Sequence, residues 1–259
     1  MRCSIRVIAN LALAATLASC APAERSADGG SVPRLTVRVL ERLYHDPEAF
    51  TQGLLVVDGD LYESTGQVGT SSVRRVELAT GTVLQRYELP SGVFGEGIAA
   101  VGDRLIVLTW TSGVAYSLDR ASLTPRAEFR YRGEGWGLCA AGAELIQSDG
   151  SNRLTRRDPA TFNPLGTIEV LEAGRPVERL NELECVHGDI YANIWLSTDI
   201  VRIDAASGRV TARIDASALR PTGGDVQDVL NGIAYDPRDA TFLLTGKRWD
   251  ILYRVRWDT

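Results

Sequence analysis

The stretch EGIAAVGDRLIVL, from Glu96 to Leu108, decides the fold, because its two apolar limbs and the turn between them recur along the chain. In four of the five copies the first limb opens on a residue followed by glycine. The copies start 40 to 50 residues apart: Gln52-Gly53-Leu54, Glu96-Gly97-Ile98, Trp136-Gly137-Leu138, Asn181-Glu182-Leu183 and Asn231-Gly232-Ile233. A period of this length indicates a repeated structural unit.

Each unit holds further short limbs after the first. The second limb follows about a dozen residues later, as in Leu61 to Ser64, a third ends near an acidic residue, and a fourth follows a turn. The limbs are rich in β-branched and aromatic residues and are bounded by Gly, Pro, Asp or Ser, which is typical of strands. Four strands per unit at this period predict a five-bladed β-propeller rather than a β-sandwich with fortuitous regularity.

The fifth unit has three limbs before the chain stops at Thr259, and a fourth is available near the other end. Residues Leu35 to Leu43 alternate as a strand does. A strand from the N-terminal side would pair an otherwise open edge of the last unit. We therefore predict an all-β protein with a propeller over residues 34–259, whose last blade is closed by an N-terminal strand.

The composition excludes several classes of protein. The 259 residues carry 28 basic and 33 acidic side chains, a formal charge of −5, which argues against a nucleic-acid partner. The two histidines, His45 and His187, are far apart in the chain, which argues against a His-rich catalytic zinc site. No run of 18 apolar residues is present, so the sequence predicts no membrane-spanning helix.

The first residues resemble an export signal of the lipoprotein type. Arg2 and Arg6 precede an apolar stretch that is too short to span a bilayer, and it runs into Leu17-Ala18-Ser19-Cys20. We predict a signal peptide over residues 1–19, lipidation at Cys20 and a flexible tether over residues 20–33. The protein is then exported to the periplasm and held at a membrane only through the lipid. An ordinary signal peptide with a chance cysteine is the alternative.

Export bears on the remaining cysteines. With Cys3 removed and Cys20 acylated, Cys139 and Cys185 are left, and two such cysteines in an oxidising compartment often pair. Both follow the first limbs of adjacent units, so neighbouring strands would bring them within bridging range. We predict a disulfide between them.

The residues that open the first limbs converge on one axis, because the first strand of each propeller blade lines the central channel. These residues are Gln52, Glu96, Trp136, Asn181 and Asn231. The second limbs add three residues at one end, namely Trp110, Trp195 and Lys247. Aromatic and polar groups that converge in a concave site predict a pocket for a small ligand.

Two of these residues carry candidate chemistry. Glu96 lies between Gly95 and Gly97, and tryptophans around its carboxylate would raise its pKa towards that of a general acid–base group. The alternative is a polar group that lines the channel and bonds to its neighbours. Lys247 is the single lysine beside 27 arginines, which indicates a position that needs a compact ammonium. The alternative is that one lysine has been retained here by chance.

Nine motifs, in order and in phase with the repeat, carry a family resemblance. They are Phe50-Thr51-Gln52-Gly53-Leu54, Glu63-Ser64-Thr65-Gly66, Phe94-Gly95-Glu96-Gly97, Gly135-Trp136-Gly137-Leu138, Ser148-Asp149-Gly150, Leu180-Asn181-Glu182-Leu183-Glu184, Ala192-Asn193-Ile194-Trp195, Val229-Leu230-Asn231-Gly232-Ile233-Ala234 and Thr245-Gly246-Lys247-x-Trp249. Over about residues 36–257 the chain resembles the plant and bacterial, papaya-type glutaminyl cyclases, which are glutaminyl-peptide cyclotransferases.

The resemblance implies an enzyme that converts the N-terminal glutamine of peptides or proteins to pyroglutamate and releases ammonia. It implies Glu96 as the catalytic general acid–base group, with Lys247 and Asn181 beside it. The implied substrate-binding residues are Phe50, Gln52, Trp110, Trp136 and Trp195. Lys247 would favour the ionised carboxylate or steady a developing oxyanion.

Other functions and ligands fit the sequence less well. A non-catalytic propeller that binds peptides or scaffolds an envelope complex is the alternative. A metal-dependent lactonase or phosphoesterase needs clustered acidic ligands, and the residues that open the first limbs include one glutamate. Plant members of the family have been described with a metal ion, but we assign no metal ligands here and expect no required cofactor. We expect a monomer.

Overall fold

The computed structural model describes residues 31–258; the predicted signal peptide, Cys20 and all but the last residues of the tether lie outside the described residues. Within that range the chain is all-β, with strands β1 to β22 and one short 3-10 helix, η1 (Ser217–Leu219). In the same residues no helix is long and apolar enough to cross a membrane.

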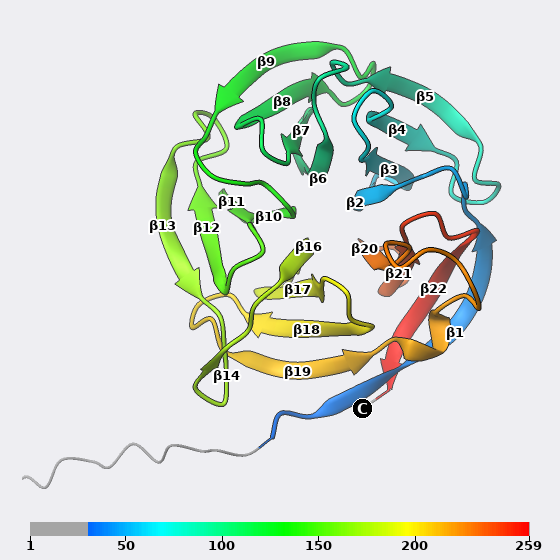
Figure 1. Ribbon diagram of the computed structural model, residues 1–259, viewed down its shortest axis with the longest axis vertical. Coiled ribbons are helices and arrows are strands. Elements are labelled where there is room, and N and C mark those ends of the chain that lie inside the picture. Colours follow the sequence, from blue (N-terminus) through cyan, green and yellow to red (C-terminus); the bar gives the residue numbers. More distant parts are fainter. Residues whose placement is uncertain (1–30, 259) are drawn as a thin grey trace, which may run out of the picture.

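Three four-stranded antiparallel sheets follow one another along the chain, each built from consecutive strands (Figure 1). The first contains β2 (Thr51–Val57), β3 (Asp60–Thr65), β4 (Ser72–Val76) and β5 (Val83–Glu88). The second contains β6 (Gly95–Val101), β7 (Arg104–Thr109), β8 (Val114–Asp119) and β9 (Pro125–Arg130). The third contains β10 (Leu138–Ala141), β11 (Glu144–Gln147), β12 (Arg153–Arg157) and β13 (Pro164–Glu169). These strands coincide with the predicted limbs.

The remaining long strands form one eight-stranded mixed sheet in the order β16-β17-β18-β19-β1-β22-β21-β20. Its members are β16 (Leu180–Val186), β17 (Asp189–Ile194), β18 (Asp199–Asp204), β19 (Val210–Asp215), β20 (Leu230–Asp236), β21 (Thr241–Gly246), β22 (Ile251–Asp258) and β1 (Arg34–Tyr44). A two-stranded hairpin, β14 (Leu171–Glu172) and β15 (Arg175–Pro176), lies between β13 and β16.

Strand β1 joins the two ends of the chain. It pairs antiparallel with β22, from Thr36 opposite Asp258 to Tyr44 opposite Ile251. The predicted pairing of an N-terminal strand with the last limbs is therefore confirmed. The first three residues of β1 also pair in parallel with β19, a contact that the sequence does not predict.

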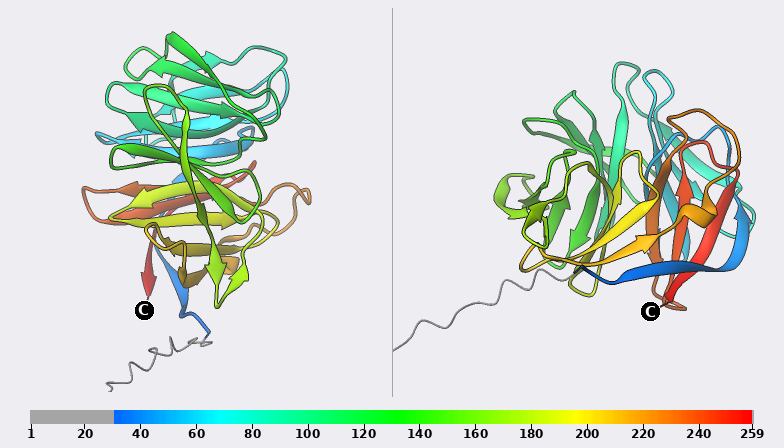
Figure 2. Two further views of the ribbon diagram at one scale, coloured as in Figure 1. Left: turned by 90° about the vertical axis from the view of Figure 1, so that its left-hand side faces the viewer. Right: turned by 60° about the horizontal axis from the view of Figure 1, so that its bottom comes forward.

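The sheets stand around a central axis, with β2, β6, β10, β16 and β20 innermost (Figures 1 and 2). This arrangement is consistent with a propeller. The inner strands approach one another so closely that a side chain at the repeated glycines would clash with the next strand. A Cβ on Gly97 would lie 2.5 Å from the amide nitrogen of Leu138, and one on Gly137 would lie 2.1 Å from the carbonyl oxygen of Asn181.

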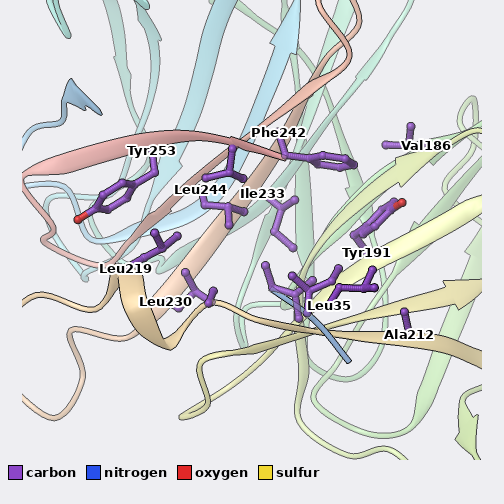
Figure 3. Packing of buried hydrophobic residues seen from close by; sticks show 14 of the residues in the cluster. Leu35, Val186, Tyr191, Ala212, Leu219, Leu230, Ile233, Phe242, Leu244 and Tyr253 are labelled. Carbon is purple, nitrogen blue, oxygen red and sulfur yellow. The ribbon is translucent and has the colours of Figure 1, made fainter. Parts of the chain in front are cut away.

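Apolar side chains fill the space between neighbouring sheets. Figure 3 shows one such cluster, which includes Leu35 from β1, Tyr191 from β17 and Phe242 from β21. Burial of this kind of surface stabilises the fold by about 25 cal/mol per Å². The cluster therefore ties the N-terminal strand to the side chains of both halves of the eight-stranded sheet.

A disulfide links the third sheet to the eight-stranded sheet. Cys139 on β10 and Cys185 on β16 are bonded, with their Cα atoms 5.5 Å apart. These are the two cysteines that were predicted to pair. The bond crosses between adjacent inner strands, close to the axis.

Candidate active site

A cavity of about 570 Å³ opens where the inner strands begin. Gln52, Glu96 and Asn181 lie at the starts of β2, β6 and β16, and Trp110 and Lys247 directly follow β7 and β21. Paired antiparallel strands place the start of one beside the end of the next, so these residues share one edge of the inner strands. All eight predicted site residues line the cavity: Phe50, Gln52, Glu96, Trp110, Trp136, Asn181, Trp195 and Lys247.

Glu96 is a buried carboxyl group in the cavity wall, with a residue exposure of 5%. Its Oε1 accepts a hydrogen bond from Gln52 Nε2 at 3.0 Å. Burial raises its pKa well above the ordinary value, the Lys247 ammonium opposes that shift, and the Glu134 carboxylate adds to it. Such a group exchanges a proton nearer to neutral pH than an ordinary glutamate does.

Lys247 is the buried cation of the same cavity, with an exposure of 4%. Its Nζ lies 4.8 Å from the centre of the Phe50 ring, within cation–π range. Burial lowers its pKa to about 8, and Glu96 opposes this shift. The ammonium is therefore charged at neutral pH and loses its proton in mildly alkaline solution.

A carboxylate outside the cavity lining holds two of its tryptophans. Oε2 of Glu134 accepts hydrogen bonds from Nε1 of Trp110 at 2.7 Å and from Nε1 of Trp136 at 2.8 Å. The Trp136 ring also packs edge-on against Trp195, with ring centres 5.6 Å apart. These contacts fix the indole planes as two apolar walls.

A buried ionic network supports the Lys247 side of the cavity. His45 Nδ1 lies 2.7 Å from the carbonyl oxygen of Trp249, and His45 Nε2 lies 3.1 Å from Glu63 Oε1. Arg74 also donates to Glu63. Burial alone would lower the pKa of His45, but Glu63 and the Trp249 carbonyl raise it above the ordinary value. Because both ring nitrogens face acceptors, the imidazolium form joins the segment before Phe50 to the turn that carries Lys247.

Several residues around the cavity were not predicted from the sequence. Phe94 lies inside a motif quoted for Glu96, and its ring packs edge-on against Phe50 and Trp110. Gln67, Asp225, Gln227 and Arg248 complete the lining. Asp225 and Gln227 lie on the segment before β20, which has no strand pattern. No residue type or spacing there distinguishes them from ordinary loop residues. Glu134 lies outside the lining, in a loop between strands, and was missed for the same reason.

The described residues offer no cluster of side chains that would ligate a metal ion. Within residues 31–258, no group of three or more His, Cys, Asp or Glu side chains is arranged to hold a metal ion. We therefore assign no metal ligands, and the expectation that no cofactor is required stays a prediction.

The fold and the site define an all-β protein with a buried carboxyl group, a buried cation and several aromatic side chains around one cavity. The family model for glutamine cyclotransferase matches residues 11–257. The chain belongs to the glutamine cyclotransferase family, as the sequence motifs predicted, and its activity is that of a glutaminyl-peptide cyclotransferase.

Two known proteins show the same relationship. The chain is 38% identical over 226 residues to a glutaminyl-peptide cyclotransferase of Arabidopsis thaliana, covering 85% of this chain and 71% of that one. It also resembles the crystal structure of Myxococcus xanthus glutaminyl cyclase, with a TM-score of 0.82 and 40% identity. That match covers 88% of this chain and 99% of the other. These similarities support the enzyme rather than the alternative of a non-catalytic binding propeller.

Proposed function

We propose that Glu96 is the general acid–base group with which this enzyme closes N-terminal glutamine to pyroglutamate. The neutral α-amine attacks the γ-carboxamide carbon of its own side chain, so a C–N bond forms. The Glu96 carboxylate takes a proton from the attacking nitrogen and returns it to the leaving nitrogen. The old C–N bond then breaks and ammonia leaves, so the protons balance without another reactant.

One observation carries this assignment. Glu96 is the buried carboxyl of the cavity wall, and its pKa is raised by burial. The other acid in the lining, Asp225, is exposed on the loop before β20. A proton shuttle works best when its pKa lies near the working pH, and burial moves Glu96 in that direction.

The remaining residues are proposed to bind and orient the substrate. The indoles of Trp110, Trp136 and Trp195 form apolar walls on which the curled glutamine side chain packs. The side chain of Asn181 makes no hydrogen bond within the part of the chain that the structure describes, so its carboxamide is available to the substrate. Because ring closure is intramolecular, holding this curled geometry supplies much of the acceleration.

Lys247 is proposed to keep part of the Glu96 population ionised. The ammonium lowers the pKa of Glu96 against the effect of burial. Removing the charge would leave Glu96 protonated up to a higher pH, and a protonated carboxyl cannot accept the amine proton.

We also propose the finer description of the fold and of its location. The eight-stranded sheet counts as two blades, β16 to β19 and β20 to β22 with β1, which makes a five-bladed propeller. The Leu17-Ala18-Ser19-Cys20 motif and the Cys139–Cys185 disulfide support an exported, periplasmic protein anchored through a lipid at Cys20. We propose that this protein is a monomer.

The test uses protein lacking the first 31 residues and washed with chelator, and follows ammonia and peptide mass with a glutamine-initiated dipeptide. Glu96→Gln is expected to fold normally and to lose on the order of 10²- to 10⁴-fold in kcat, the usual share of general acid–base catalysis. Glu184→Gln is the matched control, because this axial carboxyl also has a raised pKa, about 8, but does not line the cavity. An active Glu96→Gln protein would overturn the assignment.

A further inference from the structure

A row of three side chains from three neighbouring inner strands ends at the proposed acid–base group. Asn231 on β20 is fully buried, and its Nδ2 donates to the carbonyl oxygen of Thr51 at 3.0 Å and to Gln52 Oε1 at 3.1 Å. Gln52 on β2 in turn donates from Nε2 to Oε1 of Glu96 on β6 at 3.0 Å. Asn231 therefore reaches Glu96 only through the amide of Gln52.

The direction of this row is set by a backbone group. The Thr51 carbonyl oxygen can only accept, so the amide nitrogen of Asn231 must face it. The second hydrogen on that nitrogen faces Gln52, which turns the oxygen of Gln52 towards Asn231. The nitrogen of Gln52 then has to face Glu96. One backbone carbonyl thus decides that Glu96 receives a donor rather than an acceptor.

This arrangement leaves one polar atom of Asn231 without a hydrogen bond. Its Oδ1 is buried and has no hydrogen-bond partner within residues 31–258. A buried acceptor without a hydrogen bond destabilises the folded protein. Turning the amide over would place that oxygen against two other oxygens, those of Thr51 and Gln52. The two donors of Asn231 therefore explain why an amide lies at this position.

The donor from Gln52 has a consequence for the proton of Glu96. Oε1 already accepts the hydrogen bond from Gln52, which favours Oε2 as the oxygen that carries the proton. Within the described residues Oε2 has no hydrogen-bond partner. Oε2 is therefore the oxygen that takes the proton from the attacking amine and returns it to the leaving nitrogen, while Oε1 keeps the bond from Gln52.

We propose that Asn231 is a positioning residue that fixes the transferable proton of Glu96 on Oε2, by setting the orientation of the Gln52 amide. The proposal rests on the role of Glu96 proposed above. It requires that Asn231 act on kcat and on the pH profile of the reaction rather than on substrate binding.

Asn231→Asp tests the direction of the row, because it replaces a double donor with an acceptor of the same shape. Gln52 must then turn its nitrogen towards residue 231 and its oxygen towards Glu96, which draws the proton to Oε1. We expect kcat on the plateau of the pH profile to fall on the order of 10- to 100-fold, with KM within about threefold. The acidic limb of kcat/KM should move to higher pH, because the ionised carboxylate has lost its donor.

Asn193→Asp is the matched control. This axial amide is also buried, and its Oδ1 accepts the amide hydrogen of Gly232 at 3.0 Å, a bond that aspartate keeps. Its Nδ2 has no partner within residues 31–258, so none is lost. The control adds the same charge to the same channel without touching Gln52, and plateau kcat should stay within about twofold of the unchanged protein. An equal loss of kcat in both aspartate variants would overturn the proposal.

A double-mutant cycle keeps the proposal testable if Asn231→Asp fails to fold. Asn231→Ala should lower kcat about 10-fold in the otherwise unchanged protein. In a Gln52→Ala background it should lower kcat less than about twofold, because Asn231 acts through Gln52. Equal losses in the two backgrounds would overturn it. Glu96→Gln in the same assay separates the hypotheses: activity in that variant refutes the role of Glu96, whereas an inactive Glu96→Gln with a fully active Asn231→Asp refutes only the positioning role.

Discussion

Replacing Lys247 with methionine is expected to make the protein more stable and less active. The lysine side chain is buried, and its pKa falls from 10.5 to about 8 in the folded protein. One pKa unit corresponds to about 1.4 kcal/mol. The unfolded chain binds the proton more tightly than the folded one does, so at pH 7 the ammonium lowers the free energy of unfolding by about 3 kcal/mol. Methionine fills a similar volume without this charge.

The pH dependence of the effect has a definite sign. The folded-state pKa of Lys247 lies below the unfolded one, so the destabilisation is fully present below about pH 8. Between about pH 8 and pH 10.5 the unfolded state binds more protons, and the stability of the unchanged protein rises with pH. The advantage of Lys247→Met should therefore shrink to about 1 kcal/mol at pH 9.5.

Equilibrium urea unfolding at pH 7 and at pH 9.5 measures the gain in the free energy of unfolding at each pH. In thermal unfolding at pH 7, the Tm of Lys247→Met should be higher by about 6–12 °C. The matched control is Arg248→Met, which removes an exposed cation that lies 4.8 Å from the same Phe50 ring. Its effect on stability should stay within about 1 kcal/mol at either pH. A Lys247→Met protein that is less stable at pH 7, or a gap that does not change with pH, would refute the reasoning. Activity of Lys247→Met should fall, because Glu96 loses the cation that lowers its pKa.

Two further predictions concern residues that support the cavity. Glu134→Ala releases the indoles of Trp110 and Trp136, so KM should rise about three- to tenfold. Glu134→Gln keeps an acceptor oxygen and should change KM less. Steady-state kinetics with a glutamine-initiated dipeptide measures KM for both variants, and equal effects of the two would contradict the prediction. His45→Asn should destabilise the protein most in acid, because the raised pKa of His45 beside Glu63 gives stability that is present below pH 6.5 and is lost as the pH rises through the folded-state pKa. Urea unfolding from pH 5.5 to 8.5 measures the difference, and a difference that grows with pH would be inconsistent with the imidazolium.

The sequence by itself determined the strands and most of the cavity lining. Apolar inner strands, an alternating closing strand and turns at fixed offsets leave local patterns, so the limbs and the closing strand were predicted from residue types and their period. The glycine after Glu96 and the one after Trp136 were also visible in the sequence. Their reason, a Cβ that would meet the next inner strand at 2.5 Å or less, was not visible there.

The tertiary structure alone decided how the side chains act on one another. The parallel pairing of β1 with β19 joins strands that are distant in sequence, and Glu134 holds the indole of its near neighbour Trp136 together with that of Trp110, 24 residues earlier. The orientation of the Gln52 amide depends on a backbone carbonyl and on Asn231, 179 residues away. Hydrogen-bond direction and burial are properties of the assembled inner strands, because each strand contributes one group to them. Residue type and spacing predict where such groups lie, whereas their charge, orientation and proton positions come from their neighbours in space.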